Sequence, residues 1–129
     1  MSTLHGIDLS ASLTVADLQR SVGWYCDVLG FDVDRKYERD GVLQAVSLQA
    51  GGVRLLLTQD DGAKGADRVK GAGFSMQITT GQDIDELATR IRAAGGAFIT
   101  EPTDTPWGVR IFRLRDPDGF LFTISSPRP

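Results

Sequence analysis

The chain presents the same order of structural signals twice, and this internal repeat constrains the fold more than any other feature. In the first half, alternating apolar and small polar residues predict a strand over 8–15, and helical spacing of apolar residues predicts a helix over 17–29. Two further strands are predicted over 43–49 and 53–59, joined by a short glycine-containing turn.

The second half repeats this order. Strands are predicted over 74–80, 109–115 and 120–125, and a helix over 83–95. Between the last two strands, Asp-Pro-Asp-Gly at 116–119 predicts a tight turn, because proline fixes φ and glycine accepts a positive φ. Each half is therefore a strand, a helix, a short strand region and a hairpin, which predicts an α+β fold. A generic α+β domain whose halves look alike by chance is the alternative.

Charge and composition exclude several classes of protein. Fourteen basic against seventeen acidic residues give a net charge of −3, which does not favour nucleic acid as a partner. The neighbouring Arg110, Arg113 and Arg115 are interpreted as the solvated side of a strand, because Asp116 and Asp118 follow at once.

The sequence also predicts a cytoplasmic protein without a membrane partner. The longest apolar runs are too short to span a bilayer, and the first residues lack the pattern of a signal peptide. The single cysteine, Cys26, excludes an internal disulfide framework and a multi-cysteine metal site.

Two motifs resemble the vicinal oxygen chelate superfamily, which contains glyoxalases, bleomycin-resistance proteins, fosfomycin-resistance proteins and extradiol dioxygenases. The run VADLQRSVGWYCDVLGF resembles the opening helix of that family, and PWGVRIFRLRDPDGFLFTI resembles its last hairpin. The resemblance extends over about residues 9–126. It implies two βαβββ modules forming an open, U-shaped cleft.

The resemblance also implies a division of the single domain 1–129. The first βαβββ module is expected over 7–60 and the second over 73–126. The segment 61–72, rich in glycine, aspartate and lysine, is expected to be an exposed linker.

Enzymes of the family usually hold a divalent metal with histidine and glutamate ligands from the first and fourth strands of each module. Counted from the motifs, those positions fall at Ser10, Leu56, Ser75 and Thr123, with Phe74 as the alternative to Ser75. Hydroxyl groups are weak neutral donors and leucine offers none, so no metal and no cofactor are expected. The only histidine, His5, is interpreted as a terminal surface residue.

Strand alternation predicts which side chains line the cleft instead. Small hydroxyl and amide groups with one guanidinium should orient a ligand through hydrogen bonds, while Trp107 at the rim could stack on a planar ligand. The alternatives are that the polar groups face solvent on an open sheet and that Trp107 packs under a loop. The candidate ligand-binding residues are Ser10, Ser12, Arg54, Leu56, Ser75, Gln77, Trp107 and Thr123.

Two functions stay open at this point. The favoured one is a metal-independent small-molecule-binding protein of the glyoxalase/bleomycin-resistance type, which sequesters a drug or natural product and so confers antibiotic resistance. The alternative is a glyoxalase-like lyase or isomerase with a displaced or metal-free site, for which Glu38, Asp40 or Glu101 could serve as acid or base. Whether the chain is an enzyme is undecided.

A homodimer is expected, because the family commonly assembles its cleft from two chains and an open sheet leaves edges to cover. Trp24, on the first predicted helix, is a candidate contact residue, although core packing is its alternative.

Overall fold

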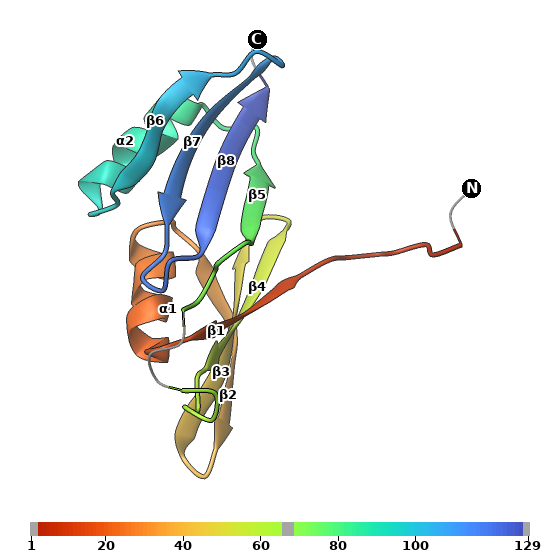
Figure 1. Ribbon diagram of the computed structural model, residues 1–129, viewed down its shortest axis with the longest axis vertical. Coiled ribbons are helices and arrows are strands. Elements are labelled where there is room, and N and C mark those ends of the chain that lie inside the picture. Colours follow the sequence, from red (N-terminus) through yellow and green to blue (C-terminus); the bar gives the residue numbers. More distant parts are fainter. Residues whose placement is uncertain (1–2, 66–68, 128–129) are drawn as a thin grey trace.

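A computed structural model describes residues 3–65 and 69–127 (Figure 1). Each half of the chain forms one four-stranded sheet and one helix, with strand orders β1-β4-β3-β2 and β5-β8-β7-β6. The predicted α+β fold of two βαβββ modules is confirmed. The elements are β1 (Ala11–Val15), α1 (Leu18–Asp27), β2 (Asp32–Arg39), β3 (Val42–Ala50), β4 (Val53–Gln59), β5 (Ser75–Thr79), α2 (Ile84–Ala93), β6 (Phe98–Asp104), β7 (Val109–Arg115) and β8 (Leu121–Pro127).

The two sheets have matching pairing. β1 runs parallel to β4 with Ser12 opposite Leu56, and β5 runs parallel to β8 with Gln77 opposite Thr123. All other neighbouring strands are antiparallel. β1 and β5 are therefore edge strands of their sheets, each with one side unpaired within its sheet.

Both helices begin at the predicted aspartates. The carboxylate of Asp17 accepts a hydrogen bond from the backbone N–H of Arg20 at 3.1 Å, and that of Asp83 accepts one from Glu86 at 3.0 Å. Such N-caps satisfy backbone donors that the first helical turn leaves unpaired. α2 also has acidic side chains in its first turn and basic ones in its last, which favours the helix dipole.

The core joins the two modules through Tyr25 of α1. Its ring makes edge-to-face contact with Phe31 of its own module at 5.7 Å and with Phe122 of β8 at 5.8 Å between centroids. Trp24 is half-buried against the same core, with its ring 5.0 Å from that of Tyr25. This contact supports the core-packing alternative for Trp24.

The turn between β7 and β8 docks on the start of α1, so the modules lie one above the other along the long axis (Figure 1). Asp118 Oδ1 accepts a hydrogen bond from the backbone N–H of Ala16 at 2.9 Å, and its Oδ2 accepts one from the Ser21 hydroxyl at 3.2 Å. Gly119 adopts the positive φ of 93° that the sequence predicts for this turn.

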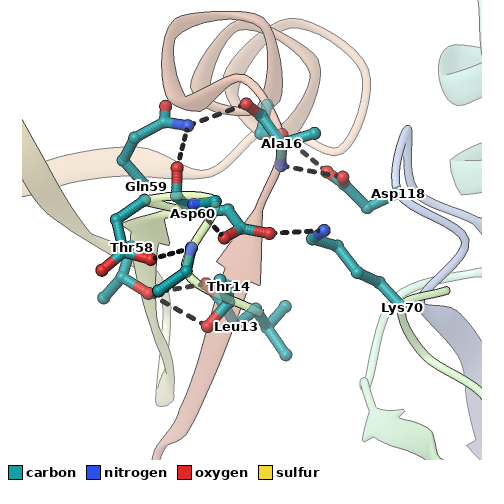
Figure 2. A network of polar contacts seen from close by, with 12 residues as sticks. Leu13, Thr14, Ala16, Thr58, Gln59, Asp60, Lys70 and Asp118 are labelled. Atoms are coloured by element: carbon teal, nitrogen blue, oxygen red, sulfur yellow. Dashed lines mark hydrogen bonds and ion pairs between the residues drawn. The ribbon is translucent and has the colours of Figure 1, made fainter. Parts of the chain in front are cut away.

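A polar network ties the inter-module segment to the first module (Figure 2). The Lys70 ammonium lies 2.8 Å from Asp60 Oδ2, and both side chains are more than nine-tenths buried. The Gln59 side chain donates to the carbonyl oxygens of Ala16 and Asp60 and accepts from the backbone N–H of Leu18. Of the predicted linker 61–72, residues 66–68 lie outside the described residues.

Three features differ from the expected elements. β1 begins at Ala11 rather than at residue 8, and residues 3–10 form an exposed arm that leaves the molecule (Figure 1). β2 and β6 have no counterpart among the six predicted strand ranges. β2 is exposed along its whole length, and Pro102 interrupts the strand signal of β6.

None of the described helices is long and apolar enough to cross a membrane.

Candidate functional site

Each sheet has one face covered by a helix and an opposite face that we call the open face. In β1 and β4, Leu13, Val15, Leu55 and Leu57 are buried in the core. Because side chains alternate along a strand, the residues between them belong to the open face. In the first module these are Ser12, Thr14, Arg54, Leu56 and Thr58, and in the second they include Ser75, Gln77, Thr79 and Thr123.

A cavity of about 590 Å³ lies where the two modules meet. Its walls come from the start of β1 and β4 in the first module and from β5 in the second, with Leu55, Met76 and Phe122 contributing apolar surface. Apolar walls with a few polar groups are typical of small-molecule sites. Five candidate ligand-binding residues line the cavity: Ser10, Ser12, Arg54, Ser75 and Gln77.

The other three candidates lie elsewhere. Leu56 is half-buried on the open face of β4, and Thr123 is buried within the second sheet. Trp107 lies in the loop between β6 and β7 with 72% of its surface exposed, so it does not pack under a loop. The structure thus brings together five of the eight residues, and the wall is less continuous than strand alternation alone suggested.

The positions that hold the metal in the family's enzymes do not fit one in this chain. Ser10, Leu56 and Ser75 offer at most weak hydroxyl donors. Thr123 Oγ1 accepts a hydrogen bond from Arg113 Nε at 3.1 Å, so a cation bound there would lie close to a guanidinium and be repelled by it. Among residues 3–65 and 69–127, no group of three or more His, Cys, Asp or Glu side chains could hold a metal ion.

Arg110, Arg113 and Arg115 of β7 do not lie together on one solvated side of the strand, contrary to the interpretation from the sequence. Arg110 contacts Asp85 of α2 through Nε and Nη2 and Asp104 through Nη1, on the helix-covered face. Arg113 points to the open face, where it is half-buried. The alternation of buried Phe112 and Leu114 with Arg113 was the signal that could have separated them.

Sequence reasoning also missed the part of the open face that belongs to β2. Arg35 and Tyr37 pair with Ser47 and Ala45 of β3, and the Ser47 hydroxyl donates to Asp34 Oδ2 at 3.0 Å. These polar residues lie in the same sheet as Arg54. The charged residues of β2 do not alternate with apolar residues in a two-residue period. Bulges shift the pairing of β2 with β3 at two places, so successive side chains do not simply alternate between the two faces.

Two buried titratable groups with shifted pKa values, Tyr25 and Asp116, lie at the junction of the modules. Tyr25 donates its hydroxyl to Asp116 Oδ2 at 2.7 Å, while Asp116 Oδ1 accepts from the backbone N–H groups of Asp118 and Phe120. Burial raises the pKa of Asp116, although the hydrogen bond from Tyr25 opposes that change. Burial, followed by the charge of Asp116, raises the pKa of Tyr25.

The residues considered as acid or base do not line the cavity. Glu101 forms an ion pair with Arg92 on the helix side, Asp40 lies in the β2–β3 turn, and Glu38 is exposed on β2. Burial raises the pKa of the Cys26 thiol, which disfavours the reactive thiolate. Of the described residues, those lining the cavity include no Asp, Glu, His or Cys.

Comparison with known proteins agrees with this fold. The profile of the Glyoxalase/Bleomycin resistance protein/Dioxygenase superfamily matches residues 7–124. A probable lactoylglutathione lyase of Vibrio cholerae is 29% identical over 122 residues, covering 90% of this chain and 87% of that protein. A bleomycin resistance protein of Geobacillus stearothermophilus is 28% identical over 127 residues, covering 88% and 91%. The chain spans only 42% of the length of the lactoylglutathione lyase GLX1 of Arabidopsis thaliana.

Among solved structures, TioX from Micromonospora sp. ML1 superposes with a TM-score of 0.77 at 24% identity, covering 95% of this chain and 99% of that one. This likeness concerns the fold. Together with the profile match across both modules, it leads to one conclusion: the chain belongs to the glyoxalase/bleomycin resistance protein/dioxygenase superfamily.

Proposed function

We propose that the chain binds an organic small molecule without a metal ion and sequesters it, as a drug- or natural-product-binding protein of the cytoplasm. The observation that carries this proposal is the cavity at the module junction, which combines apolar walls with hydroxyl, amide and guanidinium groups. Similarity to a bleomycin resistance protein along nearly the whole length supports it and favours a role in antibiotic resistance.

The second candidate is a lyase or isomerase, favoured by the similarity to a probable lactoylglutathione lyase. Such an enzyme must move a proton, which needs a positioned acid or base near the substrate. The described lining of the cavity offers serine hydroxyls, an amide and one arginine. None of these groups acts as a general base at neutral pH, so the chemistry of the lining favours binding over catalysis.

A homodimer is part of the proposal. The arm of residues 3–10 exposes Leu4, Ile7 and Leu9 almost completely, and β1 and β5 are edge strands. Exposed apolar side chains beside unpaired strand edges are typical of surfaces that another chain covers. We propose that a second copy of this chain covers them.

The binding proposal is tested by a thermal-shift screen of natural products, run with and without divalent metals, because a ligand of the native state raises the apparent stability. Hits should raise the melting temperature equally in chelator and in zinc or nickel. A lyase or isomerase would instead convert a hemithioacetal, with added metal if its metal site is displaced and in chelator if its site is metal-free.

A matched pair of variants locates the binding site. Ser12→Phe should fill part of the cavity and abolish the shift, since Ser12 lines it and is exposed. Gln44→Phe places the same ring on an exposed position of β3 outside the cavity and should retain the shift. Equal shifts in both variants would place the binding site elsewhere.

A further inference from the structure

Arg113 lies in the middle of the second sheet and points to its open face. Its Nε donates to Thr123 Oγ1 at 3.1 Å, and Thr123 is itself buried. Thr123 pairs with Gln77 of β5 on one side and with Arg113 of β7 on the other. Gln77 lines the cavity, so Arg113 lies two strands away from a residue of the cavity wall. This contact fixes the orientation of the arginine head group.

Among residues 3–65 and 69–127, no carboxylate binds the remaining guanidinium nitrogens of Arg113. The acidic residues of β6 are engaged on the helix side, where Glu101 pairs with Arg92 and Asp104 with Arg110. The ladder partners of Arg113 on its two neighbouring strands are Thr100 and Thr123. Within the described residues, no hydrogen bond or ion pair joins Arg113 Nη1 or Nη2 to another side chain.

The open face of the second sheet is therefore positively charged and lined with neutral donors. Its described positions contain two arginines and no acidic residue, and Arg115 donates to the carbonyl oxygen of Gly119. The open-face residues of β5–β8 include Ser75, Gln77, Thr79, Thr100, Thr103, Val109, Ile111, Arg113, Arg115, Leu121, Thr123 and Ser125. Partial burial removes some of the solvation of the Arg113 charge, so an anionic partner for its free nitrogens would compensate for that loss.

We propose that Arg113 is the anchor for an anionic two-oxygen group, such as a carboxylate or sulfonate, on the ligand that this chain binds. The inference rests on the proposed binding function and specifies its ligand class. A planar guanidinium held at Nε presents Nη1 and Nη2 in the fork geometry that matches two oxygens. The fixed positive charge lies beside Thr123, whose position corresponds to a metal ligand in the enzymes that the sequence resembles. A guanidinium at this place would attract the oxygen atoms of a ligand electrostatically.

Two fluorescent probes that share the same aromatic rings test this anchor. Anilinonaphthalene sulfonate carries a sulfonate, and phenylnaphthylamine lacks it. The native protein should bind the sulfonate more tightly than the neutral probe. Arg113→Gln should weaken binding of the sulfonate about tenfold or more, since a charge-assisted hydrogen bond is lost, and should change binding of the neutral probe less than twofold.

Further variants separate the anchor from general charge effects. Arg113→Lys keeps the charge without the fork and should give an intermediate loss. Arg39→Gln removes an exposed arginine at the end of β2 in the other module and should leave both affinities unchanged. Circular dichroism of each variant checks that the fold is retained.

The outcomes distinguish the anchor from the binding function on which it rests. An unchanged affinity of folded Arg113→Gln for the sulfonate would overturn the anchor, as would a loss that follows Arg54→Gln instead. Failure of the neutral probe to bind the native protein would count against the proposed small-molecule site, while the sulfonate measurements still decide the anchor. Failure of both probes to bind would overturn both proposals.

Discussion

The Tyr25 hydroxyl lies 2.7 Å from Asp116 Oδ2, joining the first helix of one module to the last turn of the other. Both side chains are buried, and the carboxylate also orders its own turn through two backbone N–H groups. One hydrogen bond thus links a helix and a turn that are 91 residues apart in sequence. Together with the hydrogen bonds of Asp118 and the contact between Tyr25 and Phe122, this pair helps to hold the modules, and the cavity between them, in their relative position.

Tyr25→Phe should lower the free energy of unfolding by about 2 kcal/mol, because a buried carboxylate loses a hydrogen-bond donor. The aromatic contacts with Phe31 and Phe122 are retained, so no cavity adds to that cost. Urea denaturation followed by circular dichroism measures the change. Tyr37→Phe on exposed β2 is the control and should be neutral. An unchanged stability of Tyr25→Phe would show that the bond contributes little.

Asp116 should give the stability a specific pH dependence. Burial raises its pKa in the folded state above the unfolded value of about 3.9. Between these two pKa values the folded state binds more protons than the unfolded state, so this group stabilises the protein as the pH falls through its folded pKa. At neutral pH its charge opposes folding.

Asp116→Asn removes this titration while keeping the shape of the side chain. The difference in unfolding free energy, native protein minus Asp116→Asn, should therefore increase as the pH falls from about 7 towards about 4. Urea denaturation of both proteins at four pH values provides the comparison. A difference that decreases on acidification would mean that the hydrogen bonds lower the pKa more than burial raises it.

Most of the fold was predictable because its signals are local. The aspartates at both helix starts, the β7–β8 turn and the alternation in β1 and β5 each specify structure through neighbouring residues. β2 was not predictable in this way. This exposed strand is stabilised by its backbone pairing with β3 rather than by burial of an apolar face. Backbone pairing does not produce a periodic pattern of apolar residues in the sequence.

The site was predictable only in part, for a similar reason. Strand alternation predicted that Ser12 and Gln77 each lie on the open face of their sheet. Whether these two residues line the same cavity depends on how the two modules pack against each other. That docking is determined by Tyr25, Asp116 and Asp118, whose sequence signals indicate only a helix and a turn. Arg113 was missed because neighbouring arginines suggested a solvated strand.

The exposed arm leads to a prediction about assembly. Replacing Leu4, Ile7 and Leu9 by serine should convert the proposed dimer into a monomer at tens of micromolar, since these side chains expose most of their apolar surface. Sedimentation velocity measures the state of both proteins. The melting temperature of the monomer should still show a cooperative transition, because the arm lies outside the core. A native chain that sediments as a monomer would contradict the prediction.

Trp107 tests whether a bound ligand extends beyond the cavity, because this residue lies in the β6–β7 loop and does not line the cavity. Its ring is 72% exposed in the loop between β6 and β7, so Trp107→Ala should leave a folded protein. If the ligand is planar and extends from the cavity to this loop, loss of stacking worth roughly 1–3 kcal/mol should weaken binding by about one to two decades. Titration of the best ligand from the thermal-shift screen, followed by calorimetry, measures the change.

Tryptophan fluorescence should respond to a ligand that extends to Trp107, since its side chain is exposed. Trp24→Phe removes the background of the other tryptophan, which packs against Tyr25, and should leave the affinity unchanged. With that control in place, a signal that persists in Trp24→Phe and disappears in Trp107→Ala assigns the contact to Trp107. Equal affinity in folded Trp107→Ala would instead show that the ligand stays within the cavity walls and never reaches the β6–β7 loop.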